Sequence, residues 1–349
     1  MHKSVSSVLL VVVVALVAGQ GTAGGGGQTG ASEAIVFERK GDLYAVAVDG
    51  SRTVQLTKTG TLELEPAVSP DGRSIAYTRP RGKYGRPGFR YEPWTMRVDG
   101  KRRMRLTRGF DSDPAWSPDG DTIFFSRYVP LGRYGIDCRL IFRVGTDGRD
   151  VRRVTRLEGH AHFDAAVSPD GGRIAFTDEN GCEGGTTSFA LSVVDASGRR
   201  TCDLSRLPGN ASYSYKDADY SLPTWSPDGS RIAFVRSFQG GAVYVANRDG
   251  SGIRRVTPPG ASDPAWSPDG AWIAYVSHAD LYITHPDGTG RRRLTRTKRG
   301  AYPPYEVRKA PPRGCRGCPL DNRLENRGQE PGSGLPRSSA PPRPGLRCR

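Results

Sequence analysis

The tetrapeptide Ser-Pro-Asp-Gly occurs five times in this sequence, and its repetition limits the possible folds more than any other feature. The copies begin at Ser69, Ser117, Ser168, Ser226 and Ser267, so they lie 48, 51, 58 and 41 residues apart. Proline presets φ at the second position of a tight turn, aspartate bonds to nearby backbone, and glycine accepts a positive φ. Apolar runs flank the copies, so each predicts a strand–turn–strand unit within a repeat protein.

The residues after each turn predict three further strands. An isoleucine and an aromatic residue alternate there, as in Ile273-Ala-Tyr275, which is the period of a β-strand. A third apolar strand usually ends in Asp-Gly, and a basic fourth strand ends in an apolar residue and threonine, as at Arg293-Leu-Thr295. Four antiparallel strands per repeat are typical of a propeller blade. We therefore predict an all-β, six-bladed β-propeller of four-stranded antiparallel blades.

Five blades are predicted to be complete, and one is predicted to consist of two separate pieces. The complete blades span residues 66–107, 114–155, 163–205, 222–257 and 264–295. Residues 35–57 supply the outer three strands of the remaining blade, and residues 301–309 are the candidate for its innermost strand, although two prolines make them a poor strand. The predicted propeller thus covers residues 34–309.

The two ends of the chain differ from the repeats in composition. Residues 1–23 resemble an export signal, with an apolar stretch too short for a comfortable membrane span, and residues 24–33 form a glycine-rich linker. Residues 310–349 are rich in Pro, Gly and Arg, which predicts a disordered tail. From Arg296 onward there are 13 basic and 4 acidic residues, so most of the formal charge of +15 lies there. The net charge alone therefore does not predict nucleic-acid binding.

The repeated motifs resemble those of the TolB-type, WD-repeat-like propeller family. The resemblance rests on Pro-Ala-Trp-Ser-Pro-Asp-Gly, Ile-Ala-Phe/Tyr, Leu-Tyr-x-x-x-x-Asp-Gly and Arg-Arg-Leu-Thr, and it covers roughly residues 34–295. It implies a six-bladed exported or periplasmic propeller that works through protein contacts, often without catalysis. The chain departs from the pattern in blade four, where Asp164-Ala-Ala and Ala196-Ser-Gly replace Asp-Pro-Ala and Asp-Gly.

Long insertions fall between strands two and three and between blades, and all of them belong on one face of the ring. They are rich in arginine and aromatic residues, which protein interfaces favour. We predict that this face binds a protein partner in the cell envelope or outside the cell; a solvated, variable surface is the alternative. The candidate residues are Arg81, Lys83, Tyr84, Arg86, Phe89, Arg90, Tyr91, Tyr128, Arg133, Tyr134, Tyr213 and Tyr215. An acidic polysaccharide is a second possible ligand, since arginine pairs with carboxylates, and nucleic acid is less favoured for an exported chain.

Four blades carry an acidic residue just before the innermost strand: Glu65, Asp113, Asp164 and Asp263. Since innermost strands line the axis of a propeller, these carboxylates could ring the channel and hold a hard cation such as Ca²⁺. Capping of the backbone of their own turns is the alternative, and the sequence favours it.

No catalytic motif is present. The sequence has no Gly-x-Ser-x-Gly elbow and no phosphate-binding loop, so we predict a protein that is not an enzyme, with a lyase or hydrolase of acidic polysaccharides as the alternative. Export permits disulfides. Cys138 and Cys182 are expected in equivalent loops of adjacent blades and are the preferred pair, with Cys182–Cys202 as the other pairing.

Overall fold

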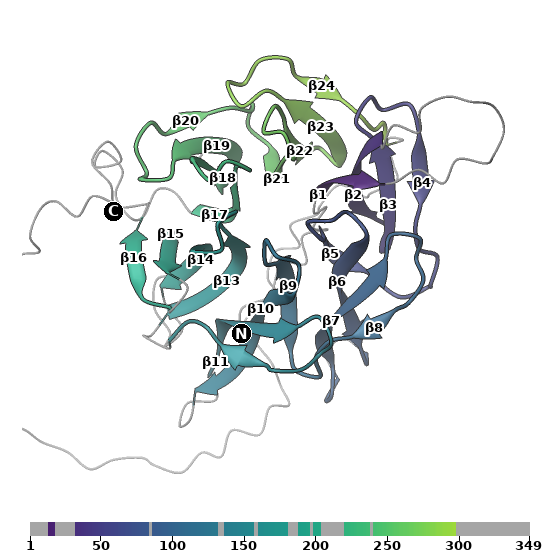
Figure 1. Ribbon diagram of the computed structural model, residues 1–349, viewed down its shortest axis with the longest axis vertical. Coiled ribbons are helices and arrows are strands. Elements are labelled where there is room, and N and C mark those ends of the chain that lie inside the picture. Colours follow the sequence, from purple (N-terminus) through teal and green to yellow (C-terminus); the bar gives the residue numbers. More distant parts are fainter. Residues whose placement is uncertain are drawn as a thin grey trace, which may run out of the picture. The chain divides into compact units, whose positions relative to one another are not determined.

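The structure is a computed structural model, and it describes residues 13–17, 32–83, 86–131, 136–156, 160–180, 188–195, 198–203, 220–237 and 240–297. In these ranges all the regular structure is β-strand, and no helix of membrane-spanning length and hydropathy occurs. The strands form six sheets of four antiparallel strands around a central axis (Figure 1). The predicted six-bladed β-propeller is therefore confirmed.

Each sheet is one blade, and its strands run in chain order from the axis outwards. Blade one holds β1 Val13–Val17, β2 Ser32–Arg39, β3 Asp42–Ala47 and β4 Thr53–Gln55. Blade two holds β5 Leu64–Val68, β6 Ser74–Arg81, β7 Arg90–Arg97 and β8 Met104–Arg105. Blade three holds β9 Asp111–Trp116, β10 Thr122–Leu131, β11 Ile136–Gly145 and β12 Arg152–Arg153.

The second half of the ring repeats this order. Blade four holds β13 His160–Val167, β14 Arg173–Asn180, β15 Ser188–Asp195 and β16 Arg200–Asp203. Blade five holds β17 Tyr220–Trp225, β18 Arg231–Arg236, β19 Ala242–Asn247 and β20 Arg254–Arg255. Blade six holds β21 Ala261–Trp266, β22 Ile273–Ser277, β23 Asp280–Thr284 and β24 Arg292–Arg293.

The Ser-Pro-Asp-Gly turns join the first two strands of blades two to six, and their side chains fix the turn. In the first copy the Ser69 hydroxyl donates to Asp71 Oδ1 at 2.6 Å and accepts the Ser74 amide at 2.9 Å. The Gly72 amide donates to the Ser69 carbonyl at 2.8 Å, and Gly72 has a φ of +68°. This conformation favours glycine. The repeated tetrapeptide therefore follows from the geometry of the turn.

The Ile–Ala–aromatic triplets of the second strands pack against neighbouring blades on both faces of each sheet. Their aromatic residues are 0% to 1% exposed: Tyr77, Phe125, Phe176, Phe234 and Tyr275. The alanines between them are completely buried: Ala76, Ala175, Ala233 and Ala274. Burial of one large apolar side chain contributes about 1.5–3 kcal/mol. The second strands therefore carry much of the stability of the ring.

Blade one is completed by a segment other than the one expected. Its innermost strand is β1, which pairs antiparallel with β2 from Val13↔Val36 to Val17↔Ser32. We expected residues 301–309 at this position, and they lie outside the described residues. The segment β1 is rich in valine and apolar, so it suits both a buried strand and the export signal predicted from the sequence. Removal of residues 1–23 would leave β2 without this neighbour.

Candidate partner-binding face and axial cavity

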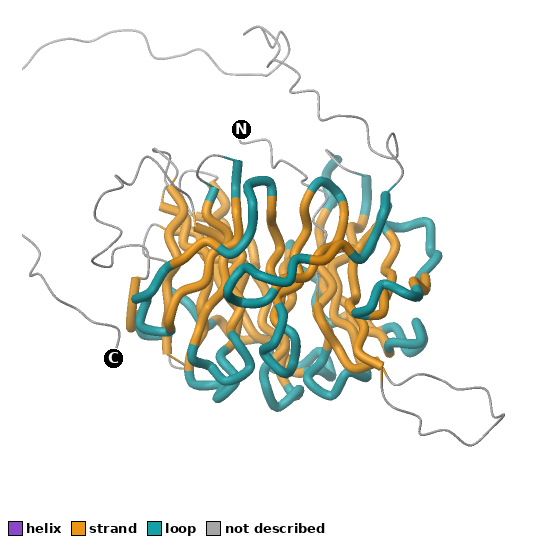
Figure 2. The backbone as a smooth tube through the Cα atoms, turned by 90° about the horizontal axis from the view of Figure 1, so that it is seen from above, coloured by secondary structure: helices purple, strands orange, loops and turns teal. Residues whose placement is uncertain are grey.

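The strand order gives the ring two faces with different connections. The Ser-Pro-Asp-Gly turns and the turns between third and fourth strands lie on one face, here called the turn face. The connections between second and third strands, and those between blades, lie on the opposite face, here called the loop face. Figure 2 shows the connections gathered along the two edges of the ring. The predicted partner-binding residues that the structure describes all belong to the loop face.

Blade two carries a long hairpin beyond the body of its sheet. The pairing of β6 with β7 runs outward from Ser74↔Arg97 to Arg81↔Arg90. At its tip Arg81, Lys83 and Arg86 are exposed, as a binding role requires. The other candidates of this hairpin are only partly exposed: Phe89, Arg90 and Tyr91. Tyr84 lies outside the described residues, as do Arg133, Tyr134, Tyr213 and Tyr215.

The partly exposed aromatic residues form a ladder that joins blades two and three. The ladder consists of Phe89, Tyr91, Phe110 and Tyr128, with ring centroids 5.1 Å apart for the first pair, 5.5 Å for the second and 4.7 Å for the third. All three contacts are edge-to-face, which is a favoured geometry for aromatic pairs. The sequence interpretation missed Phe110, although an aromatic residue in the loop between two blades is the signal that could have identified it.

A buried carboxylate holds the base of the same hairpin. Glu92 is 1% exposed, and its oxygens lie 3.0 Å from Arg90, 3.5 Å from Arg105 and 3.9 Å from Arg81. A buried charge is tolerated when it is paired and hydrogen-bonded. Glu92 therefore fixes Arg90 in a structural role, whereas the Arg81 side chain is 57% exposed and can still reach a ligand. Sequence reasoning did not identify Glu92.

A second buried acid, Asp111, lies beneath the loop between blades two and three, and it accepts a bond from a threonine whose own bonding is altered by a proline. In other blades a threonine hydroxyl accepts the amide of a third-strand residue, as Thr57 accepts Leu43 at 2.8 Å. The corresponding residue in blade two is Pro93, which has no amide hydrogen, so the Thr107 hydroxyl lacks that bond; it donates to Asp111. Arg127 then donates two bonds of 2.7 Å to the same carboxylate. This pair anchors the base of the β10–β11 hairpin.

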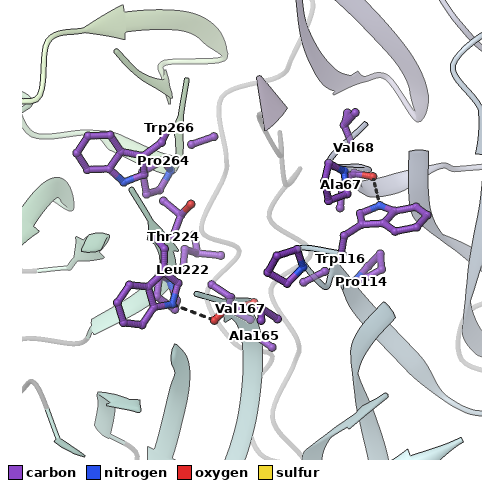
Figure 3. A pocket seen from close by; sticks show the side chains of 18 of the residues that line it. Ala67, Val68, Pro114, Trp116, Ala165, Val167, Leu222, Thr224, Pro264 and Trp266 are labelled. Carbon is purple, nitrogen blue, oxygen red and sulfur yellow. Dashed lines mark hydrogen bonds between the residues drawn. The ribbon is translucent and has the colours of Figure 1, made fainter. Parts of the chain in front are cut away.

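The innermost strands enclose an axial cavity of about 410 Å³ (Figure 3). Its walls are mostly Pro, Ala, Val and Trp, and Glu65, Asp113, Asp164 and Asp263 all line it, as predicted. Two tryptophans stabilise the wall by bonding the preceding blade: Trp116 Nε1 donates to the Ala67 carbonyl at 2.9 Å and Trp225 Nε1 to the Ala166 carbonyl at 3.1 Å.

A bulge at the same point of each inner strand places these acids. The register shifts there in blades two to six. The residue at the bulge has a φ between +53° and +55° in every case: Glu65, Asp113, Asp164, Leu222 and Asp263. A β-bulge redirects a side chain. Blade five has Leu222 at this position, so the set of acids around the axis is incomplete.

The hydrogen bonds of the four acids differ from the capping of their own turn that the sequence favoured. Glu65 accepts the Thr78 hydroxyl at 2.7 Å and the Asp113 amide of the next blade at 2.8 Å. Asp164 accepts the Thr177 hydroxyl at 3.0 Å, and Asp263 accepts the Ser262 hydroxyl at 2.6 Å. The donors to these carboxyls are thus side-chain hydroxyls and, for Glu65, a backbone amide of the neighbouring blade. They replace the turn backbone because the bulge directs each carboxyl away from it.

Burial favours the protonated form of three of these carboxyls, those of Glu65, Asp164 and Asp263. Desolvation raises the pKa of Glu65 to about 8, and the negative charge of Asp113 raises it further. Desolvation likewise raises the pKa of Asp164 to about 7 and that of Asp263 to about 7. Among the described residues no group of three or more His, Cys, Asp or Glu has an arrangement that could hold a metal ion. Calcium binding in the cavity stays a prediction.

A histidine–aspartate cluster lies on the loop face of blade four. His160 Nδ1 is 2.8 Å from Asp178 Oδ1, and His162 Nε2 is 3.8 Å from the same oxygen. Asp178 is 2% exposed, and its other oxygen accepts the Ser192 hydroxyl at 2.8 Å. Because Asp178 and His162 are buried, only His160 in this cluster is open to solvent, and the cluster offers no substrate pocket within the described residues.

The structure describes one of the two cysteines of the predicted disulfide. Cys138 is 1% exposed and belongs to a disulfide. Cys182 lies outside the described residues, and so does the side chain of Cys202. The pairing of Cys138 with Cys182 stays a prediction.

Comparison with known proteins points to one group of propellers. Residues 236–302 match the family model of the dipeptidyl peptidase IV (DPP IV) N-terminal region. A TolB homologue of Chlorobium luteolum is 31% identical over 150 residues, which cover 42% of this chain and 31% of that protein. The Tol-Pal system protein TolB of Thioalkalivibrio sulfidiphilus is 29% identical over 178 residues, which cover 45% of this chain and 38% of that protein. The chain thus spans 31% to 38% of the length of these curated relatives.

Solved structures support the same fold. The crystal structure of TolB from Acinetobacter baumannii superposes with a TM-score of 0.54 and 24% identity, and the match covers 72% of this chain and 58% of that one. At this level of identity the likeness is evidence for the fold.

Proposed function

Taking the chain as a TolB-type β-propeller, we propose that it is a non-catalytic scaffold that binds a protein partner through the loop face of blades two and three. The observation that carries the proposal is the pair of long hairpins on that face, which share an aromatic ladder, together with the exposed Arg81, Lys83 and Arg86 of the blade-two hairpin. Arginine and aromatic residues are enriched where proteins bind each other. The related proteins include one named for the Tol-Pal system, which fits a scaffold of the cell envelope.

The proposal includes export and the domain limits expected from the sequence. Residues 1–23 act as the signal peptide, residues 24–33 as a linker, residues 34–309 as the propeller and residues 310–349 as a basic tail, so that residues 301–309 take the place of β1 beside β2 after cleavage. The protein then works in the periplasm or envelope, or outside the cell. Intact-mass measurement of the exported protein tests the signal peptide, because cleavage removes a defined mass. An exported protein that retains residues 1–23 would contradict this part of the proposal.

Affinity capture tests the scaffold. The full chain is immobilised and exposed to the envelope fraction of the producing cell, in parallel with the variant Lys83→Ala/Arg86→Ala. A matched control, Lys101→Ala/Arg149→Ala, removes two exposed cations from the turn face. We expect a protein that is retained by the wild type and the control and lost by the loop-face variant. Equal retention by all three proteins would contradict the proposed face.

The carbohydrate alternative makes a different prediction in the same assay. Polygalacturonate, as the acidic polysaccharide, would bind the wild type and lose binding in the loop-face variant, and release of reducing ends would reveal turnover. Binding or turnover of this polymer without any retained protein would favour the carbohydrate-active reading over the scaffold.

A further inference from the structure

We propose that the protein partner docks on the loop face of blades one to three through an acidic segment of its chain. This inference rests on the proposed function and adds the chemistry of the partner. Among the described residues of that face, every exposed charged residue is basic: Lys40, Lys58, Arg81, Lys83, Arg86, Arg108 and Arg156. A surface with one sign of exposed charge attracts the opposite sign and accelerates its association.

Three acids in the described part of this face are turned inward, where they pair with the protein's own arginines. Glu63 is completely buried and lies 3.5 Å from Arg103, and Asp111 is completely buried beneath Arg127. Glu92 has three guanidinium groups around one carboxylate, so positive charge remains in excess there. These acids fix the loops, and they do not offset the cations at the tips.

Lys83 and Arg86 give the strongest support for an acidic partner. In the described part of the chain no carboxylate lies within ion-pair distance of either side chain. Both are exposed at the tip of the blade-two hairpin, and Leu62, an exposed leucine at 50%, lies in the adjacent loop between blades one and two. The face therefore offers cations around an apolar side chain, which suits a peptide that carries acids next to an apolar residue.

The described part of the opposite side of the ring carries less of this charge, with Arg296 as its exposed loop-face cation. The connection between β22 and β23 consists of His278 and Ala279, and the connection from blade five to blade six runs through Pro258, Pro259 and Gly260. Neither contains lysine or arginine. Among the described residues, more of the exposed basic charge of the loop face lies on blades one to three, and we place the docking side there.

The aromatic ladder favours a protein over a polysaccharide or a single-stranded nucleic acid. Sugars and bases bind aromatic residues by stacking on exposed ring faces. In the ladder the interplanar angles are 81° between Tyr91 and Phe110 and 76° between Phe110 and Tyr128, so ring edges cover neighbouring faces. This arrangement supports the hairpins and leaves little flat surface for stacking.

Photo-crosslinking in the full chain identifies the segment. A benzophenone amino acid replaces Lys83 in one protein and Lys101, on the turn face, in a control, and both are irradiated with the envelope fraction. We expect a crosslinked peptide of net negative charge from position 83 alone. A neutral or basic peptide overturns the acidic chemistry but leaves the scaffold intact. No crosslinked protein at position 83 overturns both, as does a crosslinked polysaccharide or nucleic acid.

Binding kinetics of the crosslinked segment, synthesised as a peptide, test the charge directly. The variant Lys58→Glu/Lys83→Glu/Arg86→Glu should lower the association rate at least tenfold. The control Lys101→Glu/Arg149→Glu/Arg248→Glu makes the same change of charge on exposed turn-face residues and should alter it less than twofold. The wild-type rate should also fall about tenfold between low and high salt. Equal rates for the two variants, or a rate that does not respond to salt, would overturn the inference.

Discussion

Blades two and six share one internal plan and differ in how far their second hairpin extends. Tyr77 pairs with Trp94 in blade two as Tyr275 pairs with Tyr282 in blade six. Two residues before these aromatic partners, each third strand has an acid, Glu92 in blade two and Asp280 in blade six. The pair Arg79↔Glu92 is connected through residues 80–91, whereas the pair Ser277↔Asp280 is connected through residues 278 and 279 alone. The core tolerates this difference because the insertion begins beyond the buried triplet.

The equivalent acids reveal a shared structural pair. Glu92 lies 3.5 Å from Arg105, and Asp280 lies 2.5 Å from Arg293, with both arginines on the fourth strand of the blade. Blade two adds Arg81 and Arg90 to this pair. The comparison therefore separates the acid–arginine pair that both blades share from what blade two adds on the loop face.

Replacing the blade-two hairpin by the short connection of blade six should have the largest effect on partner capture. Replacement of residues 80–91 by the dipeptide His-Ala gives blade two the connection of blade six. We expect complete loss of partner capture, with a loss of about 1–2 kcal/mol in the free energy of unfolding because Phe110 and Tyr128 lose the rest of the ladder. Capture assays and urea unfolding measure the two effects. Capture that survives the exchange would place the binding surface elsewhere.

The pH dependence of stability compares the axis with the turn face. Glu65, Asp164 and Asp263 have a raised pKa, so the folded state holds protons that the unfolded chain releases near pH 4. Their contribution is complete at low pH and is lost as the pH rises to about 7–8. Hydrogen bonds from serine hydroxyls lower the pKa of the turn aspartates Asp71 and Asp119, which favours folding above pH 4. Stability should therefore be greatest near pH 5.

Urea unfolding between pH 4 and pH 8.5 measures this profile. The variant Asp263→Asn should flatten the decline above pH 5, because asparagine does not titrate, whereas Asp249→Asn on the turn face should leave it unchanged. An equally steep decline in both variants would contradict the assignment to the axial acids. Added Ca²⁺ tests the cation prediction in the same assay: it should raise the melting temperature at pH 8.5, where the carboxyls are ionised.

Much of this fold follows from local sequence, and the missing parts have physical causes. Ser-Pro-Asp-Gly and the Ile–Ala–aromatic triplet encode turn and strand within a few residues, so the blades could be predicted. The equivalence of Glu92 and Asp280 could not, because it exists only once the register beyond the triplet is known. Val13–Val17 could not be assigned to blade one, since an apolar valine-rich run fits an export signal equally well. The bonds of Glu65 depend on a bulge and on a second blade, which no local pattern contains.

Replacing Glu92 or Asp280 by alanine tests how much the additional arginines of blade two, Arg81 and Arg90, contribute to stability. Glu92→Ala leaves three guanidinium groups without their carboxylate and should cost about 2–3 kcal/mol. Asp280→Ala removes the carboxylate partner of the partly exposed Arg293 and of the Thr295 hydroxyl and should cost about 1–2 kcal/mol. Urea unfolding of both variants at one pH provides the comparison. An equal cost would mean that Arg81 and Arg90 contribute nothing to the blade-two cluster.

The smallest expected effect separates the exposed from the structural residues of the hairpin. Arg86, Phe89 and Arg90 are all predicted to bind the partner, so alanine at each should leave melting unchanged if its side chain serves binding alone. Arg86→Ala should indeed change the free energy of unfolding by less than about 0.5 kcal/mol, because its side chain is exposed. Phe89→Ala should cost about 1 kcal/mol, because its ring packs on Tyr91 and Phe110. Thermal melting of the two single variants measures the difference, and equal melting temperatures would show that the ladder does not stabilise the hairpin.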